Sequence, residues 1–130
     1  MSALVTWLRA ELDRVEQIAR TAAIANGPTW THNPEDRWLV EGKDRPVIYD
    51  EGSPTNEQAR HIALWDPQTV LRRVAADRQI LDEHQVDVRD RPSFVLNTGT
   101  VSCCSTCWGE TWPCRTVRLL AEGYGWEEGL

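Results

Sequence analysis

The amino-acid sequence predicts a mainly α-helical protein, an antiparallel helical hairpin or bundle with a small β-hairpin beside it and a cysteine-rich C-terminal end. Three observations support this: a long helical stripe at the N-terminus, a second helical pattern in the middle, and four cysteines within twelve positions near the C-terminus. A chain of 130 residues without internal repeats has the length of one domain. We therefore treat residues 1–130 as a single domain.

Residues 2–25 carry the clearest helical pattern. Apolar residues recur at 4-3-4-3 spacing, which places them on one helix face. Ser2 fits an N-cap, and the turn residues Asn26, Gly27 and Pro28 end the segment. A stripe of this kind needs a partner surface, and we expect the second helix to cover it. The stripe comprises Leu4, Trp7, Leu8, Leu12, Val15, Ile18, Ala19 and Ala22.

Residues 28–52 have extended character. Two short β-like runs, at 37–41 and 46–50, flank a polar connection that contains Gly42. The segment is predicted to form a β-hairpin or a pair of extended segments. Because an isolated hairpin is only marginally stable, it should pack on the helices through Trp38 and Tyr49.

Residues 54–84 are predicted to form a kinked helix. Ser53 followed by Pro54 is a helix start, with serine as N-cap and proline at the first helical position. Asp66 followed by Pro67 repeats the signal, so a break or kink is expected there. The inner side is expected to carry Ala59, Ile62, Ala63 and Trp65 in the first part, and Val70, Leu71, Val74, Ala75 and Leu81 in the second.

The remaining chain is predicted to be a loop over 86–102, with an extended run at 94–96, and a knuckle with a short helix over 103–122. Pro113 can occupy the first turn of that last helix, which carries Cys114. Gly123 is expected to end the helix. The tail beyond it is expected to be loosely held.

The cysteines predict a metal site. Cys104 and Cys107 form a Cys-x-x-Cys pair, Cys114 can add a third sulfur, and His84 lies near the end of the helical pattern. Thiolate and imidazole donors in a set of four suit tetrahedral Zn²⁺, so the predicted cofactor is zinc in a closed structural site, a C-terminal zinc knuckle. Cys103 is an alternative ligand in place of His84. A disulfide or redox pair is the other reading of these cysteines.

Composition and missing motifs exclude several functions. The net charge is −6, with arginines interleaved among acids, which disfavours non-specific nucleic-acid binding. No segment approaches the ~20 apolar residues of a membrane span, and no secretion signal begins the chain, so a cytoplasmic location is expected. The chain has no glycine-rich phosphate loop, no G-x-S-x-G elbow and no His-Glu-x-x-His helix.

The order of the motifs resembles a family of small uncharacterised proteins of actinobacteria and their phages, classed as a domain of unknown function. The matching blocks are residues 4–13, 61–63, 66–67, 70–72 and 78–81 leading to His84, followed by the Cys-x-x-Cys and residues 113–121. The chain departs from the family pattern at Trp65, where a second histidine is expected, and at the extra Cys103. The resemblance implies an actinobacterial or phage origin, and a host cytoplasmic location if the protein is phage-encoded. It implies no activity.

The sequence favours a zinc-stabilised, non-enzymatic helical protein that binds a host or cellular protein, as a phage or mobile-element accessory factor. Its seven tryptophans exceed what a small core needs. One alternative is a zinc-knuckle regulator that binds nucleic acid through arginines, Trp108 and Trp112. Another is a metal-dependent hydrolase or a thiol redox enzyme. Neither the partner nor the oligomeric state follows from the sequence.

Overall fold

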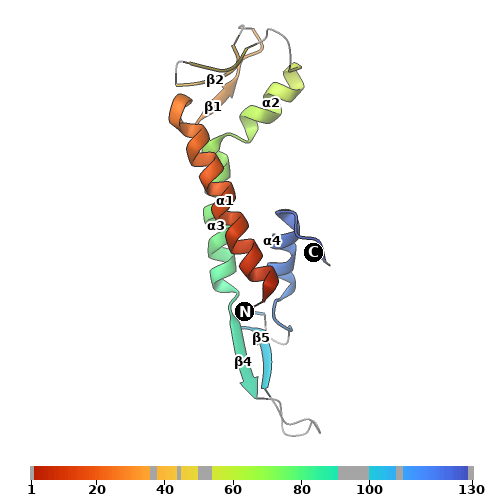
Figure 1. Ribbon diagram of the computed structural model, residues 1–130. Coiled ribbons are helices and arrows are strands. Elements are labelled where there is room, and N and C mark those ends of the chain that lie inside the picture. Colours follow the sequence, from red (N-terminus) through yellow and green to blue (C-terminus); the bar gives the residue numbers. More distant parts are fainter. Residues whose placement is uncertain are drawn as a thin grey trace. The chain divides into compact units, whose positions relative to one another are not determined.

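The computed structural model describes residues 2–35, 38–43, 45–49, 54–90, 100–107 and 110–128. Within these residues the fold is mainly helical, as predicted, with two small antiparallel sheets of strand order β1-β2-β3 and β4-β5 (Figure 1). None of the described helices combines the length and apolar character needed to cross a bilayer. The elements are α1 (Ala3–Asn26), β1 (Trp30–His32), β2 (Trp38–Gly42), β3 (Arg45–Tyr49), α2 (Asn56–Leu64), α3 (Pro67–Glu83), β4 (Val86–Asp90), β5 (Thr100–Cys104) and α4 (Arg115–Gly123).

The chain divides into two compact units. The first unit comprises Met1–Leu12 and Ala76–Leu130, and the second comprises Asp13–Ala75. Helices α1 and α3 contribute residues to both units, whereas each sheet belongs to one unit only.

Helix α1 begins and ends where the sequence predicts. The amide of Thr6 donates to the carbonyl of Ser2 at 3.1 Å, which puts Ser2 at the N-cap position, and Gly27 follows the last turn with a φ of 74°. Leu8 and Leu12 are buried in the first unit, at 0% and 1% exposure. The predicted apolar stripe therefore forms the core at this end of the helix.

One ion pair joins the ends of α1 and α3 in the first unit. Arg9, near the start of α1, lies 3.5 Å from the carboxylate of Asp82, near the end of α3. Both side chains are exposed, so the ion pair contributes little stability. It does place the start of α1 beside the end of α3. Val74 of α3 is buried in the second unit and Leu81 in the first.

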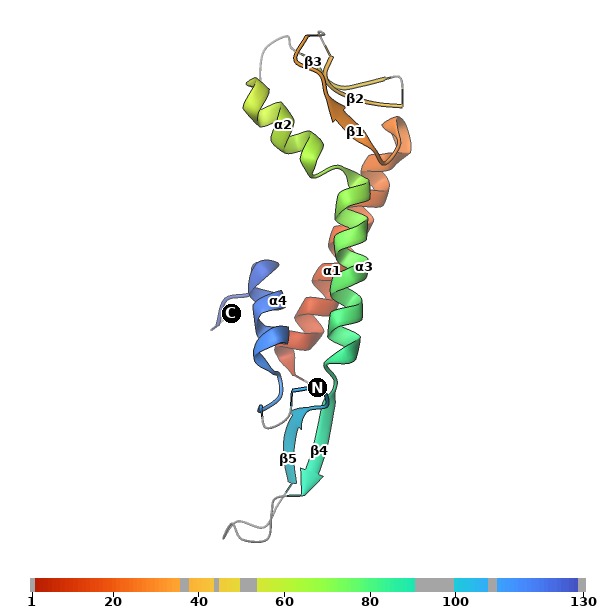
Figure 2. The same cartoon turned by 180° about the vertical axis from the view of Figure 1, so that it is seen from behind.

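The second unit contains one more strand than predicted. Strands β2 and β3 form the expected hairpin, and β1 adds to it, with Thr31 opposite Glu41 (Figure 2). Trp38 and Tyr49 are register partners, but their side chains lie outside the described part of the structure. The sheet packs on α2, as expected, through a core of Leu39, Val40, Ala59 and Ala63 with Trp30, Val47, Ile48 and Ile62 packed against it.

The start of α2 differs from the prediction. Its N-cap is Thr55, whose hydroxyl accepts from the amide of Gln58 at 3.1 Å while the Gln58 side chain accepts from the Thr55 amide at 2.9 Å. This capping box pairs the backbone amides of Thr55 and Gln58 with each other's side chains. The predicted start, with Ser53 as N-cap and Pro54 in the first turn, offers no such reciprocal pair. Pro54 therefore precedes the helix, and the predicted cap Ser53 lies outside the described residues.

The predicted break in residues 54–84 separates two distinct helices, α2 and α3. Asp66 caps the start of α3, because one of its carboxylate oxygens accepts from the Thr69 amide at 2.9 Å. Its other oxygen accepts from the amide of Trp30 at 3.0 Å, which ties β1 to the start of α3. Trp65 was expected on the inner side but is 49% exposed, because it caps the C-terminal end of α2 instead of continuing its buried face.

In the first unit, residues 86–90 and 100–104 form a hairpin where the sequence analysis expected a loop. Strand β4 pairs antiparallel with β5, from Val86 opposite Cys104 to Asp90 opposite Thr100. Val86 and Val88 alternate with Asp87 and Arg89, a short strand signal that the prediction missed. The predicted extended run at 94–96 lies outside the described residues.

Two expectations about the C-terminal end are also corrected. Pro113 precedes α4, and the N-cap residue is Cys114. The tail is not loosely held as far as residue 126, because the Tyr124 hydroxyl donates to the buried carboxylate of Asp77 at 2.7 Å. In addition, the ring of Trp126 meets that of Trp7 edge-on, with centroids 5.3 Å apart.

Candidate metal centre

Four side chains from three elements and one turn meet in the first unit. His84 follows the last residue of α3, Cys104 is the last residue of β5, Cys107 lies in the turn after it, and Cys114 is the N-cap of α4. Their donor atoms all lie within 4.8 Å of one another. The structure thus brings together the four residues that the sequence predicts as ligands.

The distances match those of a tetrahedral ion. The Nδ1 atom of His84 lies 3.4 Å from the sulfur of Cys104, 3.4 Å from that of Cys107 and 3.5 Å from that of Cys114. Zinc–sulfur and zinc–nitrogen bonds at the tetrahedral angle would separate these atoms by about 3.6 Å. A single imidazole nitrogen has one lone pair or one proton, so it cannot hydrogen-bond to three sulfurs at once. Coordination of one shared ion explains the convergence better.

The turn from Cys104 to Cys107 has the form of a knuckle. The amide of Cys107 donates to the sulfur of Cys104 at 3.4 Å. The turn is closed by two backbone bonds of 3.2 Å, from Cys104 to the carbonyl of Glu110 and from Glu110 to the carbonyl of Cys107. Trp108 and Gly109 lie outside the described residues.

Cys114 occupies the N-cap position of α4. Its side chain does not cap the helix; the carboxylate of Glu110 instead accepts from the amide of Arg115 at 3.1 Å. The sulfur is therefore left for another bond.

Hydroxyl groups of the turn after β5 bond to the backbone on either side of His84. They were not among the predicted site residues. Thr106 donates through its side chain to the carbonyl of Glu83, and Ser105 does so at 3.4 Å. The hydroxyl of Ser105 also accepts from the amide of Gln85 at 3.2 Å. These bonds flank His84 on both sides along the chain. The signal was the pair of small hydroxyl residues between the two cysteines.

The sulfurs are unequal in proton affinity. Burial raises the pKa of Cys104, but amide hydrogens of Cys107 and Thr106 and the His84 side chain outweigh it and bring the pKa to about 7. Burial, together with the neighbouring sulfurs of Cys104 and Cys114, raises the pKa of Cys107 to about 11. By itself the Cys107 thiol would keep its proton at neutral pH. A dication among them would stabilise three thiolates together.

Other predicted or candidate residues are not part of this cluster. Cys103 pairs with Asp87 in the β4–β5 register, but its side chain lies outside the described part of the structure. His61, on α2, is exposed and belongs to the second unit. The ligand role of His84 and the alternative role of Cys103 therefore stay predictions.

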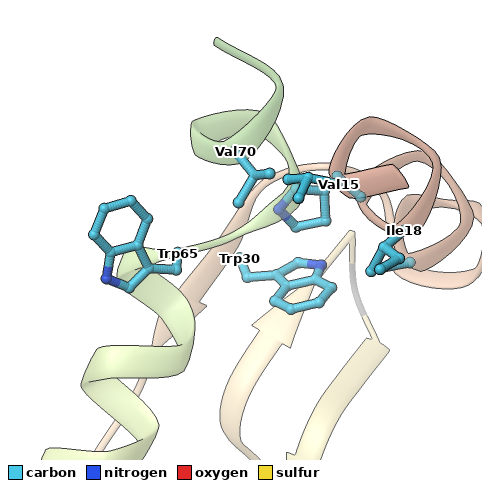
Figure 3. Close-up of a pocket in the computed structure, with 8 residues that line it drawn as sticks. Val15, Ile18, Trp30, Trp65 and Val70 are labelled. Atoms are coloured by element: carbon cyan, nitrogen blue, oxygen red, sulfur yellow. The ribbon is translucent and has the colours of Figure 1, made fainter. Parts of the chain in front are cut away.

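An apolar groove is the second notable feature, and it lies within the second unit. Figure 3 shows the indoles of Trp30 and Trp65 with Val15, Ile18 and Val70 around the opening. The volume is about 330 Å³, within the range of small binding sites. The Trp30 ring nitrogen donates to the carbonyl of Gly27 at 3.0 Å, so it does not offer an unpaired polar group. The lining also includes Ala19, Ala22 and Pro67.

Comparison with known proteins gives a family but no function. The model of a family of unknown function, DUF6221, matches residues 1–125. No curated protein and no solved structure matches the chain.

Proposed function

The chain belongs to DUF6221, a family of unknown function, and from this premise we propose that it is a zinc-stabilised, non-enzymatic protein that acts by binding another protein. The observation that carries the zinc part is the convergence of three sulfurs on the Nδ1 atom of His84 at 3.4–3.5 Å. Three thiolates and an imidazole form a donor set that zinc prefers.

A structural role fits this donor set better than a catalytic one. A catalytic zinc keeps a coordination position open for water or substrate, whereas four protein donors fill the tetrahedron. Two of the sulfurs are also closed off from solvent, since Cys104 and Cys114 are each 1% exposed. Bound there, the ion would join the end of α3, the β4–β5 hairpin and the start of α4.

The apolar groove of the second unit supports the binding part of the proposal. Ile18 is 55% exposed and Trp65 is 49% exposed at its edges, which is unusual for side chains of this size. Half of the predicted apolar stripe of α1 lines this groove: Val15, Ile18, Ala19 and Ala22. The proposed occupant is an apolar segment of a host or cellular protein. An accessory role for a phage or mobile element extends the proposal and rests on the family resemblance alone.

Native mass spectrometry tests the zinc part. We expect one zinc ion per chain in the wild type, loss or strong weakening in His84→Ala and Cys104→Ser, and full retention in the control His61→Ala. Cys103→Ser should also retain the ion. If Cys103→Ser loses zinc while His84→Ala keeps it, the site is an all-cysteine one. Protein without metal and with disulfides would contradict the proposal.

A pair of alanine variants on α1 tests the binding part. Ala22 lines the groove and Ala25 does not, and both are exposed near the end of the same helix. Ala22→Glu places a carboxylate where an apolar partner must be buried, so capture of a protein from an extract of the producing cells should fall about tenfold or more. Ala25→Glu should capture the same protein as the wild type. Equal capture by both variants, with unchanged circular dichroism, would rule out the groove as the binding surface.

A further inference from the structure

The three sulfurs of the metal centre differ in their access to solvent. Cys104 and Cys114 are each 1% exposed, whereas Cys107, in the turn after β5, is only half-buried. Once an ion holds all three as thiolates, exposure decides which of them a small oxidant reaches first. That sulfur belongs to Cys107.

We propose that hydrogen peroxide opens this site by converting Cys107 and Cys104 to a disulfide, with release of the metal ion. The inference rests on the zinc site proposed above and adds its regulation. The zinc-bound form of the first unit would be sensitive to peroxide.

Cys104 is the resolving partner because it shares a turn with Cys107. The Cys107 amide lies 3.4 Å from the sulfur of Cys104, and the two donor atoms lie within 4.8 Å of each other. Their disulfide would close within the knuckle turn. The sulfur of Cys114 is equally near the imidazole, but it is fixed at the start of α4, whose Val117 and Ala121 are fully buried. A bond to Cys114 would require that helix to shift.

The chemistry balances with peroxide as the only oxidant. The thiolate of Cys107 attacks one peroxide oxygen, the O–O bond breaks, hydroxide leaves, and a sulfenic acid forms. The thiolate of Cys104 then attacks that sulfur, the S–O bond breaks, and a second hydroxide leaves. Each hydroxide takes up a proton to become water. Two sulfurs are oxidised by one electron each, and the two peroxide oxygens are reduced by one electron each.

Loss of two donors would weaken zinc binding enough to release the ion. Only His84 and Cys114 would remain from the set of four, which is fewer than a structural zinc site uses. The hydroxyl contacts from Ser105 and Thr106 to Glu83 involve no sulfur, so the knuckle turn can stay near the end of α3 after oxidation. The change would then be reversible.

The test uses the zinc-loaded full chain treated with hydrogen peroxide. Released zinc is measured with a chromogenic chelator, and the oxidised cysteines are identified by differential alkylation before and after reduction, read by tandem mass spectrometry. We expect one zinc ion released for each disulfide formed, with Cys104 and Cys107 as the oxidised pair. The control Cys103→Ser should give the same stoichiometry and the same pair, and a dithiol reductant with added zinc should restore the site.

Two results would overturn the inference. The first is zinc-loaded protein that keeps its ion under peroxide. The second is zinc release that accompanies oxidation of a pair of cysteines other than Cys104 and Cys107. Both leave the proposed zinc site standing. A protein that never holds zinc would instead refute the proposed function, and the inference with it.

Discussion

Among the described residues, two carboxylates are buried, those of Asp66 and Asp77. Asp66 is 6% exposed, and both of its oxygens accept backbone hydrogen bonds, from Thr69 and Trp30. Burial alone would raise the pKa of this carboxyl, but the amide hydrogens of Trp30 and Thr69 outweigh it, so the pKa lies below its usual value. The ionised carboxylate therefore stabilises the native state.

Asp66→Asn is expected to destabilise the protein by about 1–3 kcal/mol at pH 7. An asparagine still offers one oxygen to Thr69, but its amide group faces the Trp30 amide as a second donor, which leaves a buried donor unpaired. Because the native pKa is lowered, the contribution of Asp66 is fully present above the unfolded pKa and is lost as the pH falls through the native pKa. Urea unfolding at several pH values measures this.

The difference in unfolding free energy between wild type and Asp66→Asn should therefore shrink below about pH 4. Glu127→Gln, an exposed acid near the C-terminus, serves as the control and should track the wild type. A difference that stays constant down to pH 2 would show that the charge of Asp66 is not the source of the effect.

The site could be predicted at the level of residue types but not of their supports. The Cys-x-x-Cys spacing, the third cysteine near a helix start and the place of His84 near the end of a helical pattern were sufficient to select the four clustered residues. The contacts of Ser105 and Thr106 with Glu83 could not be foreseen, because they depend on where the turn after β5 meets the end of α3. That meeting is set by the β4–β5 register, which the sequence pattern did not reveal.

At the level of elements, the small sheet depends on close approach between its strands and the end of α1. A Cβ atom at Gly42, the last residue of β2, would overlap the carbonyl oxygen of Asn26 and lie 2.8 Å from a ring carbon of Trp30. The indole of Trp30 is held by its bond to Gly27 and its amide by Asp66, and the Asn26 carbonyl belongs to the last residue of α1. Only glycine fits here without movement.

Gly42→Ala should consequently lower the free energy of unfolding by about 1–3 kcal/mol, the usual cost of overpacking. Gly123→Ala is the matched control: an added Cβ at this last residue of α4 meets nothing within 4 Å, so stability should stay equal or rise slightly. Thermal or urea denaturation of the two variants compares them directly. Equal stability of both variants would mean that α1 and β2 do not approach this closely in solution.

Long elements were predicted from the sequence more successfully than short ones. Helix α1 was identified because its apolar period extends from Leu4 to Ala22, about five turns, and the break before α3 because Asp66 and Pro67 form a helix start. Strand β1 has only three residues, too few to display a period. Strand β4 alternates only from Val86 to Arg89, and its partner strand follows after nine intervening residues. Pairing over such a distance is a tertiary property.

For the molecule as a whole, the two units differ in what stabilises them. The second unit has a core made of the three-stranded sheet and α2. The first unit has a two-stranded hairpin, a short helix and the ends of two long helices, and a hairpin alone is marginal. All four donor residues belong to this first unit. Metal binding should therefore contribute to the folding of one unit far more than to that of the other.

Hydrogen exchange of the zinc-loaded and the chelator-treated protein, read by mass spectrometry along the chain, tests this most directly. Removal of the ion should speed amide exchange over residues 81–90 and 100–121, where the donors lie, while residues 28–49 and 56–64 exchange as before. The loss of zinc is confirmed on the same sample by its intact mass. Unchanged exchange over 81–90 and 100–121 after complete loss of the ion would contradict a structural zinc site at His84, Cys104, Cys107 and Cys114.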